Sequence, residues 1–178
     1  MAFKRKQALL LLSILSGLLF AFSWPTYPFL PFIFIAFVPL FIIESTVNKA
    51  SSLFLYSFIS FLIWNASSTW WIINSTLGGG LIAVVANSLL MTLPVLLFHK
   101  VKKNLGDSRG YISIVFFWIT FEYMHLNWDL SWPWLTLGNV FSGRTEIIQW
   151  YEYTGVLGGS LWILIANIAL YKFLKLRF

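Results

Sequence analysis

Two uninterrupted apolar runs decide the fold of this chain: LLLLSILSGLLFAF at residues 9–22 and LWILIANIALY at residues 161–171. An α-helix rises about 1.5 Å per residue, so about 20 apolar residues cross the hydrocarbon core of a bilayer. A strand of a membrane β-barrel would instead alternate apolar and polar residues over about 10 positions. Neither run alternates, so both are predicted to be transmembrane helices.

The composition extends this prediction to the whole chain. Of its 178 residues, 59% are hydrophobic and only 10% are charged, whereas charged residues make up about 25% of a soluble domain. We therefore expect an all-α fold, a polytopic transmembrane helical bundle that forms one integral membrane domain over residues 1–178. The absence of cysteine excludes disulfides, thiolate metal sites and thiol nucleophiles.

Six apolar runs, and hence about six spans, follow one another along the chain. The first begins after the basic residues 4–6 as a signal peptide would, but no small-residue cleavage site follows, so it is predicted to be an uncleaved helix. Pro25 and Pro28 mark the next turn, and the glycines of residues 78–80 and the polar residues 99–109 are predicted to be loops. The predicted spans cover about residues 7–22, 29–43, 52–73, 81–98, 111–124 and 156–173.

The basic residues predict how these spans are oriented. With six crossings, all of the 12 Lys and Arg residues except Arg144 fall on the side of the N-terminus. Cytoplasmic loops carry such an excess of positive charge. Both termini are therefore predicted to be cytoplasmic, and topology explains the net charge of +6 better than nucleic-acid binding does.

The most unusual stretch is NWDLSWPWLTLGNVFSGRTEIIQWYEYTG at residues 127–155, between the fifth and sixth runs. We call it the aromatic segment, and the predicted topology places it on the outer face. Tryptophans at a membrane interface are commonly anchors. In the WPW cluster, however, Pro133 stiffens the backbone between Trp132 and Trp134. We interpret this cluster as a rigid edge on which acyl chains or a partner domain rest.

The second aromatic cluster, QWYEY, places Glu152 beside Tyr151 just before the sixth run. A carboxylate at the interface costs little. Glu152 could bind a lipid amine headgroup or pair with Arg144, and it could equally cap the sixth helix, whose N-terminus favours negative charge. These alternatives remain open at the level of sequence.

Glu122, His125 and Asp129 are spaced three and four residues apart, which places them on one face of a continuing helix. Such a set could act as general acid and base or as metal ligands. The alternative is that these side chains hydrate the outer end of the fifth helix. No nucleophile-and-base set, P-loop or dinucleotide fingerprint is present. The residues alone therefore predict a lipid-embedded binding or scaffolding domain without a catalytic centre, a cofactor or a metal.

Several motifs also follow one another in a characteristic order. They are AFSWP at residues 21–25, PL at 39–40, Trp70, Glu122-x-x-His125, WPWLTLGN at 132–139, and GVLGGS at 155–160 followed by Asn167. In order and spacing they resemble the N-terminal membrane domain of the apolipoprotein N-acyltransferase family over essentially all 178 residues. The chain departs from the family pattern at Trp24, inserted in the family's AFxP turn, and at His125, where the family has arginine.

This resemblance implies a multi-pass protein of the bacterial inner (cytoplasmic) membrane that handles a phospholipid acyl donor and a diacylated lipoprotein. In the family, acyl transfer passes through a thioester on the cysteine of a glutamate–lysine–cysteine triad, in a nitrilase-like domain on the outer side. No triad position can be transferred to this chain. The residues expected to contact substrate are Trp132, Pro133, Trp134, Tyr151, Glu152, Glu122 and His125.

Two functions follow from the resemblance. In the first, the chain is the membrane part of a lipoprotein N-acyltransferase, either truncated or working with a nitrilase-like catalytic domain in trans, and is not catalytic by itself. In the second, it is a stand-alone lipid- or lipoprotein-binding scaffold without enzymatic activity. A transporter is a weaker third, because transporters usually bury ionisable residues at mid-membrane and the charges here lie at predicted helix ends.

Overall fold

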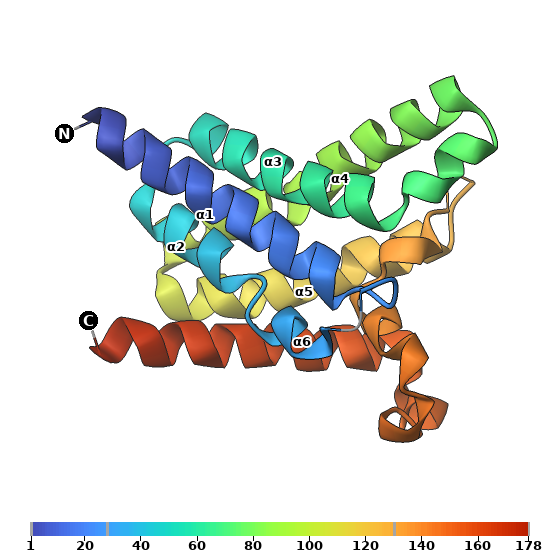
Figure 1. The fold of residues 1–178 in the computed structure, drawn as a ribbon. Coiled ribbons are helices and arrows are strands. Elements are labelled where there is room, and N and C mark those ends of the chain that lie inside the picture. The colour runs from blue at the N-terminus through green and yellow to red at the C-terminus, as the bar shows by residue number, and fades with distance from the viewer. Residues whose placement is uncertain (1, 28, 130, 178) are drawn as a thin grey trace.

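Six α-helices and five 3₁₀ helices, and no strand, make up the described part of this computed structural model, residues 2–27, 29–129 and 131–177 (Figure 1). Pro28 of the predicted first turn and Leu130 of the aromatic segment lie outside the described residues. The α-helices are α1 (Ala2–Ser23), α2 (Val38–Thr46), α3 (Ala50–Ser68), α4 (Leu77–Leu105), α5 (Asp107–Leu126) and α6 (Tyr151–Arg177). The 3₁₀ helices are η1 (Leu30–Phe34), η2 (Trp70–Asn74), η3 (Pro133–Leu135), η4 (Leu137–Gly143) and η5 (Thr145–Ile147).

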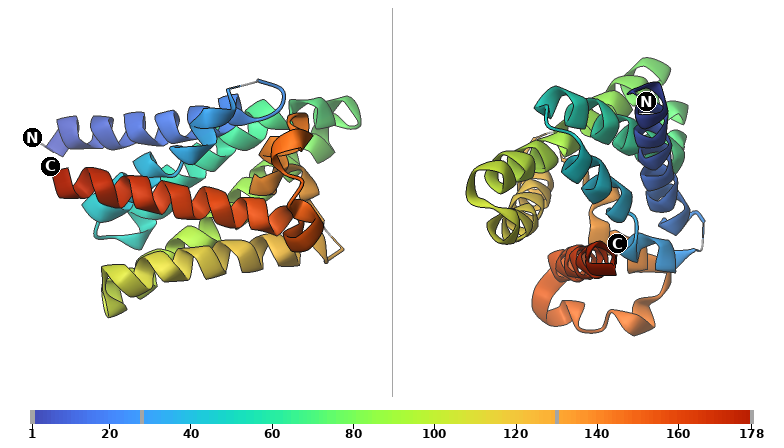
Figure 2. Two further views of the ribbon diagram at one scale, coloured as in Figure 1. Left: turned by 90° about the horizontal axis from the view of Figure 1, so that it is seen from below. Right: turned by 90° about the vertical axis from the view of Figure 1, so that its left-hand side faces the viewer.

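The long helices run side by side as a bundle, with both termini at one end and η3, η4 and η5 at the other (Figures 1 and 2). The predicted all-α helical bundle is therefore confirmed. Within the described residues, four helices, α1, α3, α4 and α6, are long and apolar enough to cross a membrane. The count of six crossings and the cytoplasmic placement of the termini stay predictions.

The connections between helices are more helical than predicted. Residues 99–109 are not a loop, because α4 continues to Leu105 and α5 begins at Asp107. Only Gly106 separates the two helices, with a φ of +85° that a residue with a side chain rarely adopts. The glycines of residues 78–80 are not a loop either and form the first turns of α4. Gly80 there lies so close to η2 that a Cβ would come within 3.0 Å of the Ile73 backbone.

The second predicted span is broken into η1 and α2, and Asn167 of α6 holds the break. The Phe37 N–H donates to Asn167 Oδ1 at 2.9 Å, and Asn167 Nδ2 donates to the Ile33 carbonyl at 2.8 Å. Backbone polar groups at membrane depth must be paired within the protein. The buried amide of Asn167 therefore supplies the bonds that a continuous helix would have made.

The core combines interlocking aromatic rings with one close helix pair. Phe20 stacks on Trp64 at a centroid distance of 4.5 Å, and Phe37 meets Trp118 edge to face at 4.9 Å. Helices α1 and α3 approach closely at Gly17, where a Cβ would lie 2.6 Å from the Ser60 carbonyl oxygen. Small residues allow such close backbone approach between membrane helices.

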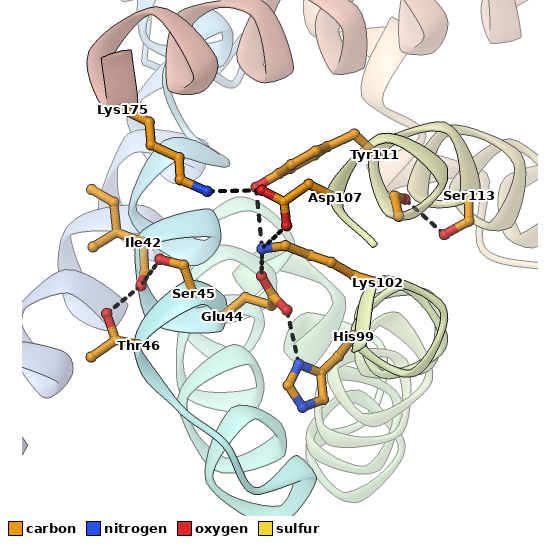
Figure 3. A network of polar contacts seen from close by, with 11 residues as sticks. Ile42, Glu44, Ser45, Thr46, His99, Lys102, Asp107, Tyr111, Ser113 and Lys175 are labelled. Atoms are coloured by element: carbon orange, nitrogen blue, oxygen red, sulfur yellow. Dashed lines mark hydrogen bonds and ion pairs between the residues drawn. The ribbon is translucent and has the colours of Figure 1, made fainter. Parts of the chain in front are cut away.

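A polar network joins four helices at the end that holds both termini (Figure 3). Buried Glu44 of α2 accepts from Lys102 of α4 and lies 2.9 Å from the His99 ring nitrogen Nδ1. Lys102 also reaches Tyr111 of α5 at 3.3 Å, and Asp107 of α5 pairs with an α6 lysine at 2.8 Å. The charged side chains at this end thus fasten α2, α4, α5 and α6 together.

Candidate functional site

The aromatic segment, residues 127–155, lies at the end of the bundle opposite the termini (Figure 1). Some of its large side chains are exposed: Trp134 is 50% exposed and Tyr153 85%. Trp134 packs edge to face against Trp71 of η2 at a centroid distance of 5.1 Å. Because Trp71 is itself 42% exposed, the two rings form an aromatic edge that spans η2 and η3.

Glu122 of α5 anchors this segment from below. Its Oε1 accepts a hydrogen bond from the Trp118 indole at 2.9 Å and one from the Leu137 backbone N–H at 2.8 Å. Glu122 is only 3% exposed, so its carboxylate lies beneath the segment. The bond to Leu137 connects α5 directly to the start of η4.

A second set of contacts holds the segment against α6. The Gly138 N–H donates to Ser160 Oγ at 3.0 Å, and the Tyr151 hydroxyl donates to the Gly138 carbonyl at 2.9 Å. A Cβ on Gly138 would lie 2.0 Å from the Val156 carbonyl oxygen. Gly155, with a φ of +62°, bends the chain at the start of α6. The GVLGGS motif therefore provides both the bend and the surface on which WPWLTLGN rests.

His125 belongs to a polar chain that crosses three helices. Its Nε2 lies 2.7 Å from Asn87 Oδ1 on α4, and Asn87 Nδ2 donates to Asn65 Oδ1 on α3 at 2.7 Å. The His125 ring also stacks on Phe121 at 4.7 Å. Since all three polar side chains are buried, these bonds satisfy groups that would otherwise be costly inside the bundle.

Two cavities along α4 adjoin His125, one between α4 and α5 and the other between α4 and the start of the aromatic segment. One, of about 260 Å³, is lined almost wholly by apolar side chains such as Leu93 and Phe117. The other, of about 420 Å³, reaches Asn87 of α4 and Asp129 of the aromatic segment. His125 lines both, so the apolar surface between the helices leads to polar groups under the segment.

The structure divides the seven predicted substrate-contacting residues into two groups. Glu122 and His125 are buried and hydrogen-bonded within the bundle, so they support the segment rather than lie on its surface. The other five lie in the segment or at the start of α6, with Trp134 and Glu152 exposed. Among the described residues, no ion pair joins Glu152 to Arg144, and no three His, Cys, Asp or Glu side chains gather as a metal site.

Sequence reasoning missed Asn87 and Gly138 as members of this region. A polar residue in a predicted span is a signal for Asn87, since such residues face neighbouring helices. Gly138 lies inside WPWLTLGN, but nothing in its local sequence shows that α6 approaches it.

The bundle and its anchored aromatic end define a helical membrane domain with a rigid aromatic surface at one end. A family model described as the apolipoprotein N-acyltransferase N-terminal domain matches residues 16–169. The chain therefore belongs to this family, as the motifs had suggested.

Curated bacterial relatives are consistent with this assignment. The chain is 32% identical to the apolipoprotein N-acyltransferase of Chlorobaculum tepidum, in an alignment that covers 88% of this chain and 30% of that protein. It is 30% identical to the apolipoprotein N-acyltransferase of Geobacter metallireducens, over 93% of this chain and 33% of that protein. The chain spans about a third of the length of these relatives. No solved structure matches it.

Proposed function

We propose that this chain is the membrane domain of a lipoprotein N-acyltransferase and lies in the bacterial inner membrane as a multi-pass protein. In this proposal, the aromatic segment receives a phospholipid acyl donor and a diacylated lipoprotein. The acyl transfer itself is carried out by residues outside these 178, because the family's thioester intermediate needs a cysteine and this chain has none. A nitrilase-like domain, covalently joined or supplied in trans, would provide that residue.

The observation that carries the proposal is the anchoring of the aromatic segment. Its exposed ring Trp134 packs against Trp71 of η2, and the segment is tied to α5 through Glu122 and to α6 through Ser160. Aromatic side chains present a large contact area with few rotatable bonds. An acyl chain or lipopeptide that lies across this edge would therefore meet a preformed surface.

Glu152 is proposed to complement this surface electrostatically. Its side chain is exposed, and none of the described residues forms an ion pair with it. A carboxylate at an interface can pair with the amine of an ethanolamine headgroup. Glu152 would then orient the headgroup while the aromatic edge contacts the acyl chains.

A chimera tests the proposal. In a bacterium depleted of its own N-acyltransferase, this chain replaces the matching third of the Chlorobaculum tepidum protein, and N-acylation of lipoproteins is measured by mass spectrometry. We expect N-acylation by the chimera, a reduced level with Trp134→Ala, and an unchanged level with Phe116→Ala, which removes an exposed ring from the α5 surface. An inserted, stable chimera that gives no N-acylation would contradict the proposal and favour the stand-alone scaffold.

A further inference from the structure

A basic pocket lies at the opposite end of the bundle, away from the aromatic segment. It has a volume of about 620 Å³ and lies where the start of α1 meets the short connection from α2 to α3. Arg5 and Lys6 of α1 and Lys49 of the connection line it, together with the polar side chains of Ser52 and Tyr56. Both termini lie at this same end of the molecule (Figure 2).

The positive charge in this pocket is not compensated by the protein. Within the described residues, no acidic side chain is within ion-pair distance of Arg5, Lys6 or Lys49, and none lines the pocket. Lys102 and Lys175 at the same end differ, because each pairs with a carboxylate. An excess of cations at this end is expected from topology alone, but topology does not require three of them to line one unneutralised cavity.

The local backbone adds further attraction for an anion. Arg5 donates to the Thr46 carbonyl at the end of α2, which holds the start of α1 against the connection. Helix α3 begins at Ala50, its N-cap residue Lys49 makes no capping hydrogen bond, and no acidic residue stands in its first turn. The N–H groups of a helix start favour negative charge, so the start of α3 acts in the same direction as the three cations.

The pocket also has an apolar side. Leu9 and Val47 line it and are 7% and 8% exposed, and Leu10, one turn along α1 from Lys6, is an exposed apolar side chain. A free anion would use only the cations. A phospholipid would use both parts, with its phosphate among the basic residues and its acyl chains along α1.

We propose that this pocket binds the headgroup of an anionic phospholipid, of the phosphatidylglycerol type, in the leaflet at the end of the bundle that holds both termini. Basic pockets between membrane helices bind anionic headgroups by this combination of charge and geometry. The inference is independent of the proposed acyl-transfer role, because it concerns the other end of the molecule and involves none of the same residues.

Native mass spectrometry of the purified full chain in detergent tests this proposal, with phosphatidylglycerol and phosphatidylcholine as probes. We expect the chain to retain phosphatidylglycerol in preference to phosphatidylcholine. Lys6→Gln/Lys49→Gln keeps the Arg5 hydrogen bond and should weaken phosphatidylglycerol binding about thirtyfold, the effect of removing two surface cations. The control Lys172→Gln/Arg177→Gln removes the same amount of charge from α6, at the same end of the bundle but outside the pocket. It should change phosphatidylglycerol binding less than about twofold.

Three results would overturn the proposal. One is equal retention of the two lipids by the unmodified chain. Another is equal weakening by the two double substitutions, which would show that overall charge at this end attracts the lipid. The third is displacement of bound phosphatidylglycerol by inorganic phosphate at comparable concentration, which would show an anion site without a lipid preference.

Discussion

Glu122 offers the most direct way to test how the aromatic segment is held. Glu122→Ala removes the acceptor of two hydrogen bonds, from the Trp118 indole at 2.9 Å and the Leu137 N–H at 2.8 Å. The first bond lies within α5 and the second joins α5 to the backbone of η4. A hydrogen bond inside a protein contributes about 0.5–1.5 kcal/mol to stability, so the two contribute roughly 1–3 kcal/mol. Both donors would stay buried without a partner, which places the expected loss of unfolding free energy near the upper figure, about 3 kcal/mol.

Glu122→Gln is the matched control, because the carbonyl oxygen of glutamine can accept the same two hydrogen bonds. It should lower the unfolding free energy by no more than about 1 kcal/mol. SDS-induced unfolding in mixed micelles measures both variants, and limited proteolysis of residues 127–150 reports whether the segment has come loose. Equal destabilisation by both substitutions would refute the reasoning, since the negative charge and not the acceptor would then hold the segment. An alanine variant as stable as the unmodified chain would refute it too.

Two further pairs of substitutions test other contacts, with the same unfolding assay. Gly138→Ala should lower the unfolding free energy by about 1–3 kcal/mol, because the new Cβ would come within 2.0 Å of a backbone oxygen of α6. The control Gly78→Ala, where nothing lies within 4 Å of the new Cβ, should leave the unfolding free energy unchanged or raise it. Equal effects of the two would contradict the close approach to α6. Glu44→Ala should lower the unfolding free energy by about 3 kcal/mol, because the largely buried Lys102 ammonium loses its close carboxylate partner and keeps only Asp107, at 4.0 Å. The control Asp107→Asn changes the Lys175–Asp107 pair, whose side chains are 53% and 54% exposed, and should lower the unfolding free energy by less than about 1 kcal/mol. A larger effect of Asp107→Asn than of Glu44→Ala would contradict the network in Figure 3.

Apolar runs predict the class of fold well because lipid imposes a simple requirement. A chain whose backbone must pair internally over about 20 residues has little choice except a helix. The runs at residues 7–22 and 156–173 accordingly fall within α1 and α6. The position of the aromatic segment at the end away from the termini also follows from the order of the runs.

Charge and glycine content were poorer guides to the connections. Residues 99–109 look like a soluble loop, yet the helix continues because Lys102 has a partner in Glu44, 58 residues earlier in the chain. The break between η1 and α2 is equally hidden, since it is stabilised by Asn167, 130 residues beyond Phe37. Local sequence does not contain such distant partners.

The predicted site shows the same limit. The exposed edge at Trp134 could be predicted because a proline between two large rings is a local feature. The burial of Glu122 could not, because its spacing from His125 fits a surface acid–base pair as well as two supports beneath a loop. Only the folded position of Leu137 distinguishes these interpretations, because its backbone N–H donates a hydrogen bond to the Glu122 carboxylate.

Site-specific crosslinking to a diacylated lipopeptide tests whether the aromatic segment receives the substrate. A photoreactive amino acid is placed at position 134 in the aromatic segment or at position 116 on the exposed side of α5, and the chain is reconstituted in phosphatidylethanolamine-containing vesicles. We expect strong crosslinking from position 134, weak crosslinking from position 116, and a reduced yield at position 134 when Glu152→Ala is added. Equal yields from the two positions, unaffected by Glu152→Ala, would contradict a substrate-receiving role for the aromatic segment.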